Sequence, residues 1–205
     1  MGIRDETKRQ TRQKLVEAGI ELFARDGLDR PSLDAICAHA GFTRGAFYVH
    51  FSDREDFLVA VMEQAGGPIL DAILTTDPES DFSQVVTRFL AAAMDGTYPL
   101  TPQGGVRPHQ LLDACARSER VRELYVRLIA DSIERLGATL SHSQGGGTVR
   151  ADLDPHATAT MLLALVIGAQ TMMELGAPLD LAAVSGALLA MLTRAGPGHG
   201  SDSTE

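Results

Sequence analysis

Residues 32–51 constrain the fold of this chain most strongly, because they predict two short helices joined by a tight turn. One apolar stripe at helical spacing comprises Leu33, Ile36, Cys37 and Ala40. Ser32 is a favoured residue just before a helix, and Gly41 tolerates the positive φ at which a helix can end and turn sharply. The stretch therefore predicts a first helix that begins after Ser32 and ends at Gly41.

A second helix is expected from Thr43, which is a good cap, to Phe51. Phe47 and Phe51 are four residues apart and should point inward. The opposite face carries Arg44, Gly45, Tyr48 and His50. This is the layout of a helix-turn-helix, whose second helix enters the major groove of DNA. A helical hairpin with a solvated polar face would explain any one of these residues alone, but their joint occurrence favours the helix-turn-helix.

The residue types suit contact with a duplex. Arg44 can reach base edges, and Gly45 leaves bare surface on which the helix can approach DNA closely. Tyr48 and His50 flank the helix rather than lead it, so we expect them to contact phosphates.

Residues 7–62 resemble the DNA-binding region of the tetracycline-repressor (TetR) family of one-component bacterial regulators. The resemblance covers about a quarter of the chain and rests on residues 15–27 (LVEAGIELFARDG), 32–41, 43–51 (TRGAFYVHF) and 52–58. Cys37 departs from the family, which usually has Ala there, but both residues are small. The resemblance implies that Arg54 touches a phosphate. The predicted DNA-binding residues are therefore Ser32, Phe42, Thr43, Arg44, Gly45, Tyr48, His50 and Arg54.

Two further helices should complete this region. The first is expected from Thr7 to Asp26, with a capping box at residues 7–10 and Gly27 as its terminator. A second capping box at residues 52–55 should start a helix that leads out of the DNA-binding region.

The net charge of −9 argues superficially against a DNA-binding protein, but the charge is uneven along the chain. Residues 1–62 carry nine Lys or Arg against ten Asp or Glu, and the remainder carries nine against seventeen. An acidic second domain would help orient the other end toward DNA.

The N-terminus lacks the apolar segment of a secretory signal, and both cysteines fall on apolar helical stripes. We therefore expect a soluble, cytoplasmic protein with reduced thiols.

The chain beyond residue 62 also shows helical periodicity, so the predicted fold class is all-α. Turn signals fall at residues 66–68, 76–78, 98–102 and 104–105, and residues 143–147 predict a flexible loop. The expected division is a three-helix helix-turn-helix domain at 1–62, a larger helical effector-binding and dimerisation domain at 63–195, and a disordered tail at 196–205.

Residues 157–175 and 181–192 predict two helices that are apolar on nearly all sides. The uninterrupted apolar part of the first is too short to cross a bilayer, so we expect no membrane segment. A purely intramolecular core would explain both helices. A four-helix interface in a homodimer is favoured, because each helix has more apolar surface than one domain can hide. The predicted interface residues are Leu162, Val166, Gln170, Ser185, Leu189 and Leu192.

The middle helices supply candidates for an effector pocket, although a residue of this kind is more often plain core than a ligand contact. These candidates are Phe89, Met94, Tyr98, His109, Leu112, Cys115, Tyr125, Met161, Met172 and Met173. Methionine suits an adaptable apolar cavity.

No histidine has metal-like spacing to a cysteine or to another histidine, and no nucleophile elbow or phosphate-binding glycine loop is present. We expect neither catalysis nor a cofactor nor a metal.

Together these patterns predict a homodimeric DNA-binding transcriptional regulator that binds double-stranded operator DNA. It is expected to be a repressor released by a small-molecule effector. An activator or a ligand-independent regulator of the same fold remains an alternative, as does, remotely, a helical adaptor that binds only protein.

Overall fold

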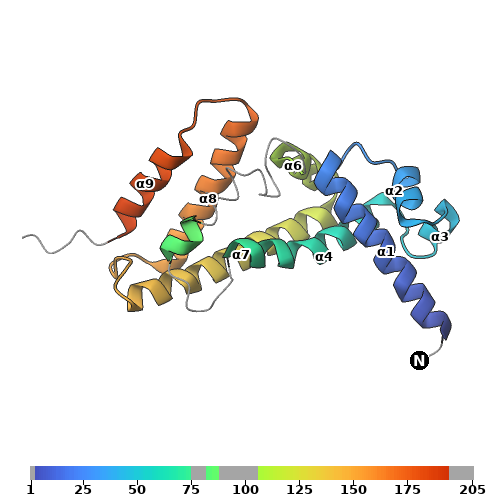
Figure 1. The fold of residues 1–205 in the computed structure, drawn as a ribbon, viewed down its shortest axis with the longest axis horizontal. Coiled ribbons are helices and arrows are strands. Elements are labelled where there is room, and N and C mark those ends of the chain that lie inside the picture. Colours follow the sequence, from blue (N-terminus) through green and yellow to red (C-terminus); the bar gives the residue numbers. More distant parts are fainter. Residues whose placement is uncertain (1–2, 75–81, 88–105, 194–205) are drawn as a thin grey trace, which may run out of the picture.

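The structure is a computed structural model that describes residues 3–74, 82–87 and 106–193, and every element in these ranges is a helix (Figure 1). The helices are α1 (Ile3–Asp26), α2 (Leu33–Ala40), α3 (Arg44–Tyr48), α4 (Arg54–Leu74), α6 (Pro108–Arg117), α7 (Glu119–Gly145), α8 (Pro155–Glu174) and α9 (Leu181–Leu192). A further helical segment covers residues 82–87. The all-α fold class is confirmed.

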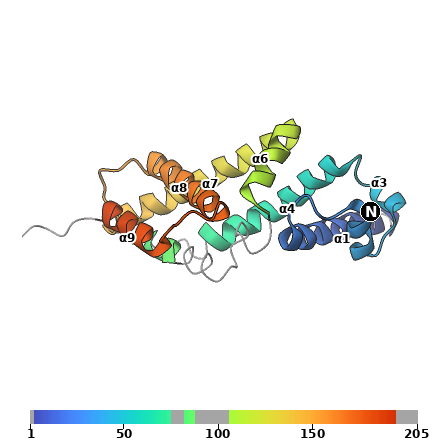
Figure 2. The ribbon, with the colours of Figure 1, turned by 90° about the horizontal axis from the view of Figure 1, so that it is seen from above.

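The molecule is elongated, with α1, α2 and α3 at one end and α8 and α9 at the other (Figures 1 and 2). Helices α4 and α7 run between the two ends and pack against each other, and α7 continues against α8. Helix α6 lies near the C-terminal end of α1 (Figure 1). This arrangement presents α3 at the tip of the molecule.

The caps of the two short helices are those the sequence predicts. The Ser32 hydroxyl accepts a hydrogen bond from the Ala35 N–H at 3.1 Å, and the Thr43 hydroxyl accepts one from the Ala46 N–H at 3.3 Å. Gly41 has a φ of 77°, in the left-handed region that favours glycine. Both predicted helix starts and the predicted stop are confirmed.

Two other predicted starts were wrong by a few residues. Helix α1 begins at Ile3 rather than Thr7, so Thr7 lies inside the helix, where its carbonyl accepts from the Thr11 hydroxyl at 3.0 Å. The box at the start of α4 is shifted by one residue. Asp53 caps the Asp56 N–H at 2.8 Å, and the Asp56 carboxylate accepts from the Ser52 N–H at 3.0 Å. A short carboxylate bonds these N–H groups as well as a hydroxyl or a Glu does.

Two predicted interruptions do not end their helices. Helix α4 continues through residues 66–68 to Leu74, and α7 extends to Gly145 through most of the predicted loop at 143–147. Glycine and proline weaken a helix locally, but flanking turns can carry it across. The expected domain boundary at residue 62 therefore falls within one continuous helix, and the domain division stays a proposal. The predicted tail at 196–205 and the turns at 76–78, 98–102 and 104–105 lie outside the described residues.

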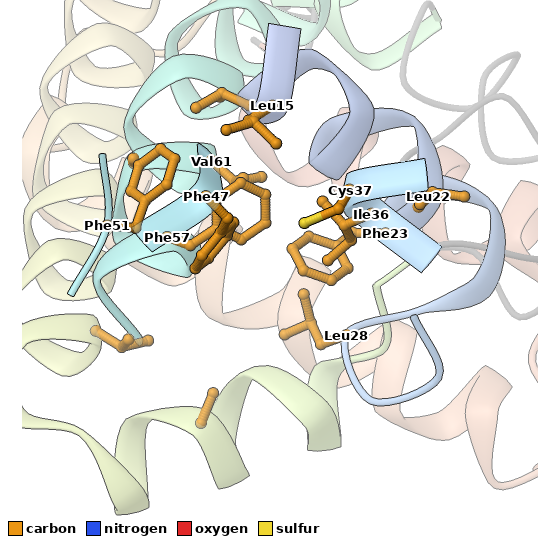
Figure 3. Close-up of a cluster of buried hydrophobic side chains, with 14 of the residues drawn as sticks. Leu15, Leu22, Phe23, Leu28, Ile36, Cys37, Phe47, Phe51, Phe57 and Val61 are labelled. Carbon is orange, nitrogen blue, oxygen red and sulfur yellow. The ribbon is translucent and has the colours of Figure 1, made fainter. Parts of the chain in front are cut away.

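The first core cluster joins the two halves of the chain (Figure 3). Leu15, Phe23, Ile36, Phe47 and Phe57 are at most 2% exposed and come from α1 to α4. The same cluster contains residues of α6 and α7, namely Leu111, Ala114 and Val121. The helix-turn-helix therefore does not stand apart but shares its core with the helices that follow it.

A second cluster lies around α7 and α8. It contains Phe82, Val85, Val86, Leu136, Leu140, Val149, Ala159, Leu162 and Leu192. Leu162, Leu192 and Gln170, which were predicted at a dimer interface, are thus buried within one chain. An all-apolar helix does not reveal which face turns inward. Val166, Ser185 and Leu189, also predicted there, are only partly buried.

Helix α8 is, among the described residues, the one helix long and apolar enough to cross a membrane by length and composition. Only 22% of its most apolar stretch is buried within the chain. A helix at an interface between protein subunits meets the same criteria.

We predict that Gly19→Ala destabilises the protein. A Cβ at Gly19 would lie 2.5 Å from Phe57 Cζ and 2.8 Å from Val61 Cγ2, where two packed helices approach closely. The clash should lower the free energy of unfolding by about 1–3 kcal/mol, measured by urea denaturation. Gly45→Ala is the control, because the nearest atom to its Cβ is 3.7 Å away. Equal stability of the two variants would contradict the close packing of α1 on α4.

Candidate DNA-binding site

Helix α3 is only five residues long and is held in place by aromatic packing. The ring centroids of Phe47 and Phe51 are 5.2 Å apart, those of Phe47 and Phe57 are 5.3 Å apart, and Phe51 meets Phe57 edge-on at 5.0 Å. Such a short helix is not stable alone. The aromatic cluster fixes the direction of α3 and therefore fixes which side chains it exposes.

The outward face of α3 is uncovered. Arg44 and Gly45 are exposed, and Tyr48 and Val49 are 52% and 61% exposed. The Tyr48 ring packs at 86° on Phe47 with its centroid 5.4 Å away, so the buried ring orients the exposed one. The sequence predicted this face except for Val49.

The predicted polar groups have capacity to bind phosphate. Ser32 and Thr43 use their oxygens as acceptors in the two caps, which leaves each O–H able to donate to an anion. Arg44 Nε lies 3.4 Å from the Asp34 carboxylate, and both side chains are more than half exposed. An exposed pair of this kind contributes little, so a phosphate or base can replace Asp34. Phe42 packs partly against the core and positions its neighbour Thr43.

His50 is half-buried at the end of this unit. Burial lowers its pKa, and the nearby cations Lys8 and Arg12 lower it further. His50 is therefore mainly neutral at pH 7. A phosphate would favour the charged form and would raise the pKa again.

Arg54 is engaged within the protein. Its guanidinium donates to the carbonyl of Pro31 at 2.8 Å and to that of Leu28 at 2.6 Å, and it stacks 5.6 Å from the Phe23 ring centroid. Burial lowers the pKa of this side chain. Arg54 therefore holds the loop that precedes α2 against α4. A phosphate contact by Arg54 stays a prediction.

Sequence reasoning missed the residues that tie this loop and the start of α4 to the second half of the chain. The side-chain oxygen of Gln110, on α6, accepts from the Leu28 N–H at 3.2 Å. Arg117 lies 3.6 Å from Asp29, and Arg120 donates to Asp56 at 3.0 Å. Partners so far apart in sequence leave no local pattern from which to find them.

The predicted pocket residues are scattered. Cys115, Tyr125 and Met173 are partly buried, and burial together with nearby Cys115 raises the pKa of Tyr125. His109 is exposed and pairs with Glu174. Leu112, Met161 and Met172 are exposed on this chain, so an enclosed pocket within it does not include them. Phe89, Met94 and Tyr98 lie outside the described residues.

The capped pair of helices, the glycine turn and the exposed Arg44 face define a helix-turn-helix protein. The profile described as "Bacterial regulatory proteins, tetR family" matches residues 15–61, which span α1 to the first half of α4. This part of the chain is therefore similar to the DNA-binding region of the TetR family of regulators.

Two curated relatives extend the comparison. An uncharacterised HTH-type regulator, TtgW of Pseudomonas putida, is 35% identical over 41% of this chain and 63% of its own length. The HTH-type transcriptional repressor DhaR of a Mycobacterium species is 28% identical over 80% of this chain and 82% of its own. The chain thus spans less than two thirds of the first relative, and these relatives are transcriptional regulators.

Solved structures share the fold. A TetR regulatory protein from Rhodobacter sphaeroides superposes with a TM-score of 0.70 at 21% identity, covering 89% of this chain and 98% of that one. SmeT of Stenotrophomonas maltophilia, solved with triclosan, gives 0.59 at 24% identity over 92% and 96%.

We predict that Arg44→Ala weakens specific operator binding by about 1–3 kcal/mol without changing fold or assembly. Arg44 is exposed at the start of α3 and has only the weak Asp34 partner. Fluorescence anisotropy at moderate salt measures the effect. Unchanged affinity would show that Arg44 does not face the duplex.

Arg54→Gln is predicted to act on stability instead. It removes two charge-assisted bonds to buried carbonyls. The free energy of unfolding should fall by roughly 1.5–3 kcal/mol in urea denaturation. A variant as stable as the wild type but with a shallower salt dependence of DNA binding would instead establish a phosphate contact.

Proposed function

We propose that this protein is a homodimeric, DNA-binding transcriptional regulator, and that it is a repressor which a small-molecule effector releases from its operator. The observation that carries the proposal is the exposed face of α3, held rigidly by the Phe47, Phe51 and Phe57 rings at the tip of the molecule. The match of residues 15–61 to a family of regulators supports it. Activation, or regulation without a ligand, would use the same DNA-binding surface.

A buried, unpartnered amide supports effector binding. Among the described side chains, Gln170 Nε2 is the one buried polar atom without a hydrogen-bond partner. An unsatisfied buried donor costs about 1–3 kcal/mol, which an acceptor atom on a ligand would offset. SmeT, of the same fold, is described in complex with triclosan. We therefore assign Gln170 to the polar part of the effector site, beside the partly buried Met173.

Contacts lead from that position to the DNA-binding end. Gln170 is one turn before Glu174, which pairs with His109 on α6. Gln110, which follows His109 on α6, accepts a hydrogen bond from the Leu28 N–H in the loop before α2. A ligand that shifts α8 relative to α6 would act on this loop and change the separation of two recognition helices in a dimer. The equilibrium then moves away from the spacing that fits half-sites about 34–36 Å apart.

The outward surfaces of α8 and α9 fit a second copy of the chain. An exposed stripe on α8, spaced by three and four residues, consists of Met161, Leu165, Gly168 and Met172, and the C-capping residue Leu175 continues it. Exposed small residues on α9 permit close helix approach, and Met191 extends the apolar surface. Both helices lie at the end opposite α3, so two chains joined there could present two separate recognition helices (Figure 2).

The proposal places the protein in the cytoplasm, where its DNA lies, and assigns it no catalytic role. The sequence offers no nucleophile or metal motif for one. The division into a DNA-binding domain at 1–62, an effector-binding and dimerisation domain at 63–195 and a tail at 196–205 is part of the same proposal.

Selection of duplexes from a random-sequence library with the purified full-length protein tests the function. A palindromic consensus, bound more tightly than random duplex and more weakly as salt rises, is the expected result. Binding to no duplex at any salt concentration would overturn the proposal and favour the protein-binding adaptor.

Leu165→Glu is predicted to split the dimer while leaving the chain folded, because Leu165 is 41% exposed on one chain. The variant should sediment as a monomer and lose operator binding, since one half-site supplies too few contacts. Leu162→Glu is the matched control one turn away. That side chain is 4% exposed, so its charge should destabilise the fold itself by several kcal/mol, on the order of 3–5. A dimeric Leu165→Glu protein would place the interface elsewhere.

A further inference from the structure

The first half of α1 projects beyond the core. None of the residues from Asp5 to Lys14 is buried, whereas Leu15 and Val16, which follow directly, are fully buried. A free helical extension of this length is marginal in water. Its turns are held by local bonds, such as the Arg9–Glu6 ion pair and the hydrogen bond of 2.9 Å from Gln13 to Glu17.

Two cations on this extension are placed differently from the rest. Lys8 and Arg12 are four residues apart and continue the line of Leu15 and Val16, so they occupy the inward face of α1 past the end of the core. Neither makes an ion pair with a carboxylate among the described residues. The inward face of the helix thus changes from apolar to positive where the core ends.

This positive face lies beside the residues that follow α3. The Arg12 guanidinium lies 5.2 Å from the centroid of the Phe51 ring, and the His50 ring lies 6.4 Å from the same centroid. Lys8 and Arg12 also lower the pKa of His50, which places both cations within electrostatic reach of it. Figures 1 and 2 both show the N-terminal end of α1 at the same end of the molecule as α3.

We infer that the Lys8–Arg12 face of α1 is a second DNA contact, which binds backbone phosphates beside the groove that α3 enters. The inference rests on the proposed function. The occupant is duplex DNA because the exposed positive face adjoins the helix-turn-helix, where Arg12 lies over the Phe51 ring beside His50. A phosphate contact carries no sequence information, so this face anchors the protein and Arg44 reads the bases.

The test compares Lys8→Gln and Arg12→Gln with Lys14→Gln. Lys14 also lies in the exposed part of α1 but on the opposite face, so its variant loses the same charge without the proposed contact. Affinity of the full-length protein is measured by fluorescence anisotropy from about 50 to about 200 mM salt, for a random-sequence duplex and for the selected operator.

Removal of each phosphate contact should reduce the slope of log K against log salt by about 0.9, equally for both duplexes. Lys14→Gln should leave the slope unchanged, and Arg12→Lys, which keeps the charge, should restore it. Equal slopes for Lys8→Gln, Arg12→Gln and wild type would overturn the inference. A loss confined to the operator would also overturn it, because it would indicate base reading. If the wild type binds no duplex at all, the proposed function fails instead.

Discussion

The packing of Phe47, Phe51 and Phe57 is the interaction on which the rest of the structure depends. Helix α3 has five residues and too few internal hydrogen bonds to persist without it. The three ring centroids lie 5.0 to 5.3 Å from one another, in tilted or edge-on arrangements that aromatic rings favour. Because Phe47 and Phe51 lie inward, the intervening Tyr48 is directed outward. The orientation of the DNA-binding face is therefore a consequence of core packing.

The same core makes that face sensitive to distant parts of the chain. Leu111, Ala114 and Val121, from α6 and α7, complete the cluster that supports α2 and α3. Gln110 and Arg117 contact the loop before α2, and Arg54, from α4, donates a hydrogen bond to a carbonyl of the same loop. A relative movement of α6 must disturb these contacts or carry the loop with it. The shared core and these contacts are therefore sufficient to couple the two ends of the molecule.

Sequence reasoning found the parts of the fold that local chemistry determines. Ser32, Gly41 and Thr43 set the ends of their helices through hydrogen bonds and a positive φ within a few residues, so their roles could be read directly. Contacts between distant residues were not predicted. The phosphate contact of Arg54 stays a prediction, while its carbonyl partners on residues 28 and 31 are visible only in the fold. Leu162 and Gln170 were expected at an interface because α8 is apolar all round, and periodicity cannot choose between two apolar faces.

The positions of the charged residues explain DNA binding in a way that the net charge does not. An acidic chain binds DNA only if its positive groups are concentrated where the duplex lies and its acids are kept elsewhere. Arg44 is restrained by one weak pair with Asp34, and Lys8 and Arg12 stand on a helix extension that the core does not need. The field at the tip is therefore set by a few side chains, while the acidic remainder disfavours approach in any other orientation. Affinity should accordingly depend steeply on salt, even though the chain carries a net charge of −9.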